Sequence, residues 1–239
     1  MRKLKCVLVG CLAAVLIISI SALPFGISAI MDSTNHNKSN LSDMDTIQLN
    51  LNGEMTELAP VQKLQLVGCG ASTEVAENQA LHTPDQIKQL VIENLQRYTD
   101  AGLFIGDVSI LEMQVCAPLL YYNIDDAEQY NIFWTVEMTD IAPEQKLELL
   151  IDDNSGAIYL IDYYCTAEAA IDSSSATKAN VERLAVCFFD SLHIDYVVED
   201  CYQSENKTWY LSAVCSDRNQ EVKVELYYFG NGFYCEINS

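Results

Sequence analysis

Histidine and cysteine are the residues of this sequence that could together form a nucleophilic catalytic site. The histidines are His36, His82 and His193. A cysteine nucleophile needs a histidine base within hydrogen-bond reach. Cys187 and His193 lie six residues apart near the end of a predicted helix, which places them on different faces of that helix. The other two histidines lie in a polar segment and just before a predicted helix. We therefore predict no catalytic residues and no enzymatic activity.

Two clusters of acidic residues could carry chemistry, the first as a calcium loop and the second as a pair of acid/base carboxylates. The run from Asp152 to Gly156 is rich in oxygen ligands, but it lacks the later glutamate that completes an EF-hand calcium loop. Asp, Asn, Ser and Gly are also the common residues of a hairpin turn, so we interpret this run as a turn. Asp125, Asp126 and Glu128 are interpreted as part of a solvated loop. No metal site and no cofactor is predicted.

Cysteine spacing indicates no zinc or redox motif. Of the nine cysteines, two lie in the apolar N-terminal run and seven lie beyond it, with no pair spaced as CxxC. Seven is an odd number, so an oxidised monomer would keep at least one free thiol. Cys215 and Cys235 both point inward on predicted strands and form the pair that we expect to be a disulfide. The alternative, that the cysteines are small buried thiols, stays open.

The first thirty residues carry an export signal. Arg2, Lys3 and Lys5 precede residues 6–30, which contain no charge. The unbroken apolar stretch Cys6–Leu23 has 18 residues and would span about 27 Å at 1.5 Å per residue. This length favours a membrane anchor with the C-terminal part outside the cell membrane. The helix breakers after Leu23 favour cleavage after Ala29 and secretion instead, and both alternatives stay open.

The exported part is strongly acidic, and its charge limits the class of partner. Beyond residue 30 there are 10 basic and 34 acidic residues, a formal charge of −24. Nucleic acids and anionic lipids would be repelled by such a body. We therefore predict that the protein does not bind nucleic acid. The membrane is predicted as a partner only through residues 6–30.

The segment that follows the apolar run is predicted to contain a spacer and short strands. Residues 31–45 are polar and predict a flexible spacer. Residues 46–80 are predicted as a lead-in with a β-hairpin, because Asn52-Gly53 is a typical two-residue turn. Within this lead-in, residues 61–67 are predicted as a further strand and residues 68–77 as a loop.

Hydrophobic periodicity in the remainder predicts two units, residues 81–168 and 172–239, each with one helix followed by an antiparallel sheet. The first helix begins at Thr83, where Thr83 and Gln86 form a capping box. The second helix covers residues 177–192. Strands are predicted at residues 111–115, 132–138, 147–151, 158–164, 196–203, 209–215, 222–229 and 233–237.

The two units share an order of elements and matched positions that suggest a diverged tandem repeat. Trp134 and Trp209 are the only tryptophans, and each opens a strand of its unit. Gly156 corresponds to Gly232 in the final turn. The predicted fold class is therefore α+β, with an N-terminal hydrophobic helix followed by two tandem helix-plus-sheet units.

The segment from Phe133 to Glu137, followed by Leu149–Asp152 and Gly156–Ile158, resembles the end of a PepSY domain. The resemblance covers mainly residues 133–161 within the wider range 83–163. It implies a small extracytoplasmic, non-catalytic module of bacterial cell-envelope proteins that modulates a partner. It assigns no functional residues, because the positions that are recognised in the family are structural.

Adjacent tyrosines near predicted strand ends suggest an interaction surface. Neighbouring residues of a strand face opposite sides of the sheet, so one tyrosine of each pair is expected to be exposed. The pairs are Tyr121–Tyr122, Tyr163–Tyr164 and Tyr227–Tyr228. The resulting hypothesis is a membrane-tethered, extracytoplasmic, non-catalytic interaction or modulatory protein of a bacterial envelope. The alternatives are an exported hydrolase with a dispersed Cys/His/acidic site and a small-ligand carrier.

Overall fold

The structure is a computed structural model that describes residues 57–126, 128–140, 144–166, 176–217 and 220–238. All of these residues belong to one compact unit, Leu49–Ser239. The predicted N-terminal helix, the polar spacer, the Asn52-Gly53 turn and the cleavage site after Ala29 lie outside the described residues. Within the described ranges, none of the helices is long and apolar enough to cross a membrane.

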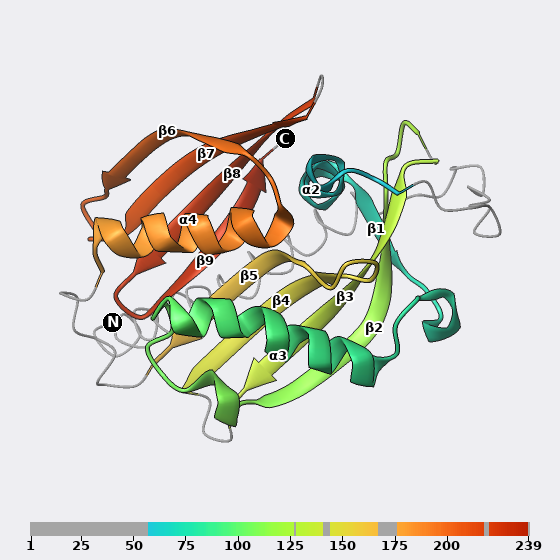
Figure 1. The fold of residues 1–239 in the computed structure, drawn as a ribbon, viewed down its shortest axis with the longest axis horizontal. Coiled ribbons are helices and arrows are strands. Elements are labelled where there is room, and N and C mark those ends of the chain that lie inside the picture. Colours follow the sequence, from blue (N-terminus) through green and yellow to red (C-terminus); the bar gives the residue numbers. More distant parts are fainter. Residues whose placement is uncertain (1–56, 127, 141–143, 167–175, 218–219, 239) are drawn as a thin grey trace, which may run out of the picture. The chain divides into compact units, whose positions relative to one another are not determined.

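Nine strands form one antiparallel sheet with the order β1-β2-β3-β4-β5-β9-β8-β7-β6 (Figure 1). The strands are β1 (Ala71–Glu74), β2 (Glu112–Tyr122), β3 (Tyr130–Thr139), β4 (Gln145–Asp152), β5 (Ile158–Cys165), β6 (Tyr196–Gln203), β7 (Trp209–Asp217), β8 (Gln220–Phe229) and β9 (Gly232–Asn238). The α-helices are α2 (Pro60–Cys69), α3 (Pro84–Asp100) and α4 (Lys178–Leu192). Two 3-10 turns are η1 (Glu77–Gln79) and η2 (Val108–Ile110).

This architecture contradicts the predicted fold class of two tandem helix-plus-sheet units. The predicted strands exist, but β2–β5 and β6–β9 belong to one continuous sheet because β5 pairs with β9. The matched tryptophans also differ, since Trp134 lies in the middle of β3 and Trp209 is the first residue of β7. A sheet edge exposes unpaired backbone groups, and joining two edges satisfies them. Hydrophobic periodicity carries no information on which edges meet.

The seam between β5 and β9 is short and depends on a glycine. Three residue pairs join the two strands, with Asp162 opposite Tyr234 and Tyr164 opposite Gly232. By comparison, seven pairs join β8 to β9. A Cβ atom at Gly232 would lie 2.1 Å from the backbone oxygen of Tyr163. Only glycine therefore lets β9 approach β5 at this point.

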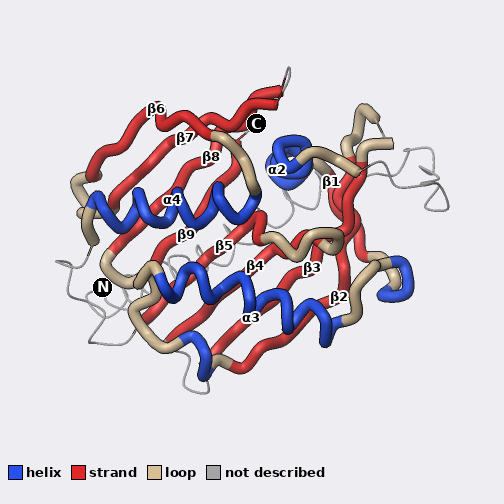
Figure 2. Tube along the Cα trace, in the orientation of Figure 1, coloured by secondary structure: helices blue, strands red, loops and turns tan. Residues whose placement is uncertain are grey.

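Helices α3 and α4 pack on the same face of the sheet, α3 across β2–β5 and α4 across β6–β9 (Figures 1 and 2). Each helix buries a stripe of apolar residues at helical spacing, as predicted from the sequence. The α3 stripe is Ile87, Val91, Leu95 and Tyr98, and the α4 stripe includes Val181, Leu184, Ala185, Phe188 and Leu192. The capping box of α3 is confirmed, since the Gln86 side chain accepts a hydrogen bond from the Thr83 backbone N–H at 2.9 Å.

The lead-in segment differs from its prediction. Residues 61–67 belong to helix α2 rather than to a strand, and Ala71–Glu74 form β1 within the range predicted as a loop. Pro60 occupies the first turn of α2, where its missing N–H has no cost. The Gln62 side chain accepts a hydrogen bond from the Ala59 N–H at 2.9 Å. These start signals were present in the sequence and outweigh its strand-like residues.

Candidate functional site

The run from Asp152 to Gly156 is the β4–β5 turn, as predicted, but its first carboxylate is fully buried rather than solvated. Asp152 accepts hydrogen bonds from Lys63 Nζ and Asn131 Nδ2, both at 2.7 Å, and from the Ser155 backbone N–H at 3.1 Å. Burial raises the pKa of Asp152, but the charge of Lys63 and the hydrogen bonds outweigh it, so this pKa lies below its usual value. The Asp152 carboxylate is therefore bound by donor groups of the protein itself.

The second carboxylate of the turn holds the start of α3. Asp153 accepts hydrogen bonds from the backbone N–H groups of Leu81 at 2.6 Å and His82 at 3.1 Å. It also accepts one from the Trp134 indole Nε1–H at 2.8 Å. The His82 ring Nδ1 contacts the Asp153 backbone oxygen at 2.5 Å. His82 is thus tied to the turn by its backbone and its ring.

Replacing Trp134 with phenylalanine should destabilise the protein by about 1.5–3 kcal/mol, because the buried Asp153 carboxylate loses a charged hydrogen bond. Urea unfolding of the full chain measures this change. Trp209 is only partly buried and makes no side-chain hydrogen bond to the described residues, so Trp209→Phe is the matched control with a clearly smaller loss. A double-mutant cycle with Asp153→Ala, which removes the acceptor, isolates the hydrogen bond, and additive losses would contradict its assigned role.

The other predicted chemistry-bearing residues do not converge. His193 caps the C-terminus of α4 in the left-handed region at φ 56°. Cys187 is also on α4, and its thiol lies 3.9 Å from the Arg97 backbone oxygen. Asp126 is used within its own loop, where it accepts a hydrogen bond from the Glu128 N–H at 3.2 Å. No group of three or more His, Cys, Asp or Glu side chains suited to a metal ion occurs among the described residues.

All seven cysteines beyond the N-terminal run are free thiols within the described ranges. Cys215 and Cys235 are buried, as predicted, but β8 separates their strands. Two strand spacings amount to about 9.6 Å, beyond the Cα separation of roughly 7 Å that a disulfide allows. The structure therefore does not form the expected disulfide. Burial instead raises the pKa of both thiols to about 12.

The face of the sheet opposite α3 and α4 carries a row of four tyrosines, which we call the tyrosine ladder. Its members, Tyr202, Tyr210, Tyr227 and Tyr234, lie directly opposite one another on β6, β7, β8 and β9. The ring centroids of successive members are 4.8, 5.3 and 4.4 Å apart. Tyr202 is 47% exposed and the other three are half-buried. The ladder is thus a continuous aromatic strip across four strands.

The hydroxyl groups in the middle of the ladder share one carboxylate. Tyr210 donates to Glu225 Oε1 at 2.5 Å, and Tyr227 donates to Glu225 Oε2 at 2.9 Å. Burial and the Glu225 carboxylate raise the pKa of Tyr210 to about 12, and they also raise the pKa of Tyr227. Both phenols are therefore neutral at physiological pH. The strip combines apolar ring area with fixed hydrogen-bonding edges, the combination that suits recognition.

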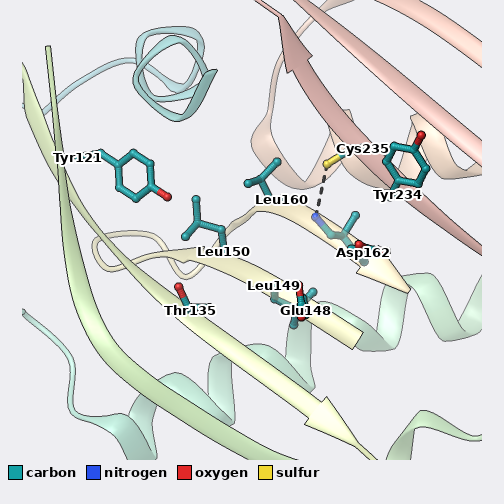
Figure 3. Close-up of a pocket in the computed structure, with 10 residues that line it drawn as sticks. Tyr121, Thr135, Glu148, Leu149, Leu150, Leu160, Asp162, Tyr234 and Cys235 are labelled. Carbon is teal, nitrogen blue, oxygen red and sulfur yellow. Dashed lines mark hydrogen bonds between the residues drawn. The ribbon is translucent and has the colours of Figure 1, made fainter. Parts of the chain in front are cut away.

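A cavity of about 310 Å³ adjoins the ladder on the same face. Figure 3 shows Tyr121 on one side of the cavity, Tyr234 and Asp162 on the other, and Leu150 and Leu160 between them. The dashed line in Figure 3 is the contact at 3.4 Å in which the Ile161 N–H meets the Cys235 thiol. This thiol lies at the end of the paired stretch between β5 and β9, where it accepts the hydrogen bond of the Ile161 N–H.

Comparisons with known proteins add no family. No protein-family model matches the chain, and no curated protein or solved structure is significantly similar to it. The resemblance to PepSY modules therefore stays a prediction.

Sequence reasoning found part of this site. It predicted that one tyrosine of each adjacent pair is exposed, which holds for Tyr164 at 45% exposure but not for the other two pairs, whose members are half-buried or buried. It also named Tyr227 as an interaction candidate. It missed Tyr202, Tyr210 and Tyr234, which have no tyrosine neighbour in the chain and join the ladder only through strand register. Counting residues from the turn between β6 and β7 places Tyr202 opposite Tyr210. This hairpin register is the signal that could have found both residues.

Proposed function

We propose that this protein is a membrane-tethered, extracytoplasmic, non-catalytic binding protein of a bacterial envelope, and that it contacts a partner protein through the tyrosine ladder. The charged residues before the apolar run 6–30 support the location, since they are typical of an export signal. The engaged positions of His82 and His193 support a binding role over hydrolysis. Neither ring is placed beside a cysteine nucleophile by any hydrogen bond in the described part of the chain.

The tyrosine ladder is the single observation that carries the proposal. Tyrosines are enriched at protein interfaces because they supply a large contact area with little loss of side-chain entropy. Cross-strand aromatic pairs also stabilise a sheet by about 0.2–1 kcal/mol each, but the partly exposed rings of the ladder leave contact area for a partner. Along β7, β8 and β9 the ladder tyrosines alternate with buried residues, and α3 and α4 pack on the buried side of the sheet (Figure 1). These two helices therefore do not cover the rings.

Site-specific photo-crosslinking in cells of the native host tests the proposal. A benzoylphenylalanine replaces Tyr202 or Tyr234 in one set of variants, and Ile92 or Val186 in the control set. Ile92 and Val186 are exposed by 56% and 47% but lie on α3 and α4. We expect one discrete adduct from the ladder positions and none from the helix positions. Equal adducts from both faces, or none from the ladder, would contradict the proposal.

Location is tested separately by fractionation and by added protease. The C-terminal part should be found with the membrane, or in the medium if cleavage occurs, and should be accessible to protease outside the cytoplasmic membrane. Recovery of the protein in the cytosol would remove the basis for an extracytoplasmic role.

A small-ligand carrier is the second candidate, because one observation favours it. A groove of about 340 Å³ lies between α3 and the sheet, with Leu95, Met113 and Met138 among its lining residues. This volume is at the lower end of the usual range for small-molecule pockets, roughly 300–1,000 Å³. Binding of an apolar fluorescent dye that is lost in Met113→Trp, and kept in Val186→Trp, would favour this function. Dye binding that ignores Met113→Trp would end it.

A further inference from the structure

The cavity beside the tyrosine ladder lies between an aromatic surface and a row of carboxylates. Strand register continues the ladder directly from Tyr234 to Asp162 on β5, Glu148 on β4 and Glu137 on β3. Four aromatic rings are thus followed by three acidic side chains in one row. Asp162, Glu148 and Tyr234 all line the cavity.

One face of the Tyr234 ring is turned toward this cavity, and the Phe229 ring lies nearby with its centroid 6.2 Å away. The other face of Tyr234 stacks on Tyr227, with centroids 4.4 Å apart and planes inclined by 11°. Because β9 lies between β8 and β5, the face turned away from Tyr227 is directed toward Asp162. The face of an aromatic ring carries negative partial charge and attracts cations within about 6 Å.

The two carboxylates of the cavity are under-neutralised. Asp162 and Glu148 are directly opposite on adjacent strands, an arrangement that is unfavourable for like charges. Lys146 pairs with Glu148, whereas Asp162 forms no ion pair with the described residues. Burial and the nearby Glu148 raise the pKa of Asp162, and the charge of Lys146 opposes them only in part. A further cation would relieve this repulsion.

The rest of the cavity is mainly apolar, with Thr135 as a further polar side chain. Leu150 and Leu160 lie between the acidic end and Tyr121 (Figure 3). A ligand that fits must therefore combine a cationic head with an aliphatic stem. Arginine meets these requirements better than lysine, because its planar guanidinium stacks on aromatic rings, binds carboxylates in a bidentate manner and is weakly hydrated.

We propose that this cavity binds an arginine side chain of the partner protein, with the guanidinium between the Tyr234 ring and the Asp162 and Glu148 carboxylates. The aliphatic stem lies over Leu150 and Leu160. This inference rests on the proposed function, since it assigns the chemistry of the partner that docks on the tyrosine ladder. The formal charge of −24 beyond residue 30 draws cationic segments to the whole body, and the cavity supplies the local preference.

The test must separate a local site from diffuse attraction of cations to an acidic protein. Calorimetric titration of the full chain at physiological salt uses two capped peptides, one of alternating glycine and arginine and one of alternating glycine and lysine. Asp162→Asn is compared with Glu93→Gln, which removes the same charge from an exposed position on α3. Tyr234→Leu is compared with Tyr164→Leu, an exposed tyrosine that does not line the cavity.

We expect Asp162→Asn and Tyr234→Leu each to weaken binding of the arginine peptide by about tenfold. Glu93→Gln and Tyr164→Leu should change it by less than about twofold. The lysine peptide should bind more weakly to the unmodified chain. Glu148→Gln is a second variant that keeps the test valid if Asp162→Asn does not fold, as judged by circular dichroism.

Equal losses from Asp162→Asn and Glu93→Gln would show diffuse electrostatic attraction and overturn the inference. Equal affinity for both peptides, unchanged by Tyr234→Leu, would also overturn it. Crosslinking from the ladder with no cavity-dependent peptide binding would overturn the arginine site alone and leave the binding function standing. Absence of crosslinking together with cavity-dependent peptide binding would support the site and contradict docking on the ladder.

Discussion

Replacing Lys63 with methionine should lower the free energy of unfolding by about 3–5 kcal/mol, because it leaves the buried Asp152 carboxylate without its cation. Both side chains are almost completely buried, with exposed fractions of 5% and 0%. Urea unfolding of the full chain measures the loss. Lys88→Met is the matched control, since Lys88 pairs at 3.7 Å with an exposed Asp85, and such surface pairs contribute about 0–1 kcal/mol.

The effect should depend on pH in a defined direction. The pKa of Asp152 is lowered in the folded protein, so its contribution to stability is complete above the unfolded-state pKa of about 3.9. This contribution is lost as the pH falls through the lower folded-state value. In Lys63→Met the buried carboxylate has a raised pKa, so the difference in stability between parent and variant should narrow as the pH falls, beginning above about pH 4 and ending below the lowered pKa of the parent. A difference in the free energy of unfolding that is constant with pH would contradict the buried ion pair. A loss of stability no larger than that of Lys88→Met would also contradict it.

Replacing Gly232 with alanine should destabilise the protein by about 3 kcal/mol or more, because the methyl group would overlap the backbone of β5. The new Cβ would lie 2.1 Å from the Tyr163 backbone oxygen, which cannot move aside as a flexible side chain would. The adjoining hydrogen bond from Cys165 N to Asn231 O, 2.8 Å long, would be strained as well. Thermal or urea unfolding measures the loss.

Gly68→Ala is the control for this substitution. Gly68 is exposed within α2, where alanine is favoured over glycine by up to about 1 kcal/mol. The two glycine-to-alanine changes should therefore have opposite signs. A change of less than about 1 kcal/mol at Gly232 would mean that β9 can shift without loss, and that the seam does not depend on the glycine.

Local elements were predictable where one periodic pattern and one cap agreed. The helix after Thr83 has both, and its start and apolar stripe are as expected. The prediction of a strand at residues 61–67 is wrong because apolar residues there fall at both strand-like and helical positions. Pro60 is the local signal that favours a helix. The contact that fixes this helix, Lys63 with Asp152, spans 89 positions of the chain, so no local pattern reports it.

The arrangement of the strands could not be predicted for a related reason. The β5–β9 seam has three residue pairs, and its requirement is the absence of a side chain at Gly232. A glycine after Asn231 is read as a turn residue whether or not another strand lies beside it. The ladder likewise needs the register of three hairpins at once, including the irregularity between Val198 and Asp200. Tyrosines adjacent in the sequence could suggest an interaction surface, but not a continuous row of tyrosines across four strands.

The reactivity of the Cys235 thiol should report local opening of the sheet between β5 and β9. This thiol is closed off between β5 and β9 at the end of the three-pair seam, where local separation of strands disrupts the fewest backbone bonds. The sulfur is largely buried at the edge of the cavity, so separation of these strands would raise the rate at which a thiol reagent labels it. The short seam is the line along which we expect the two parts of the sheet to separate first.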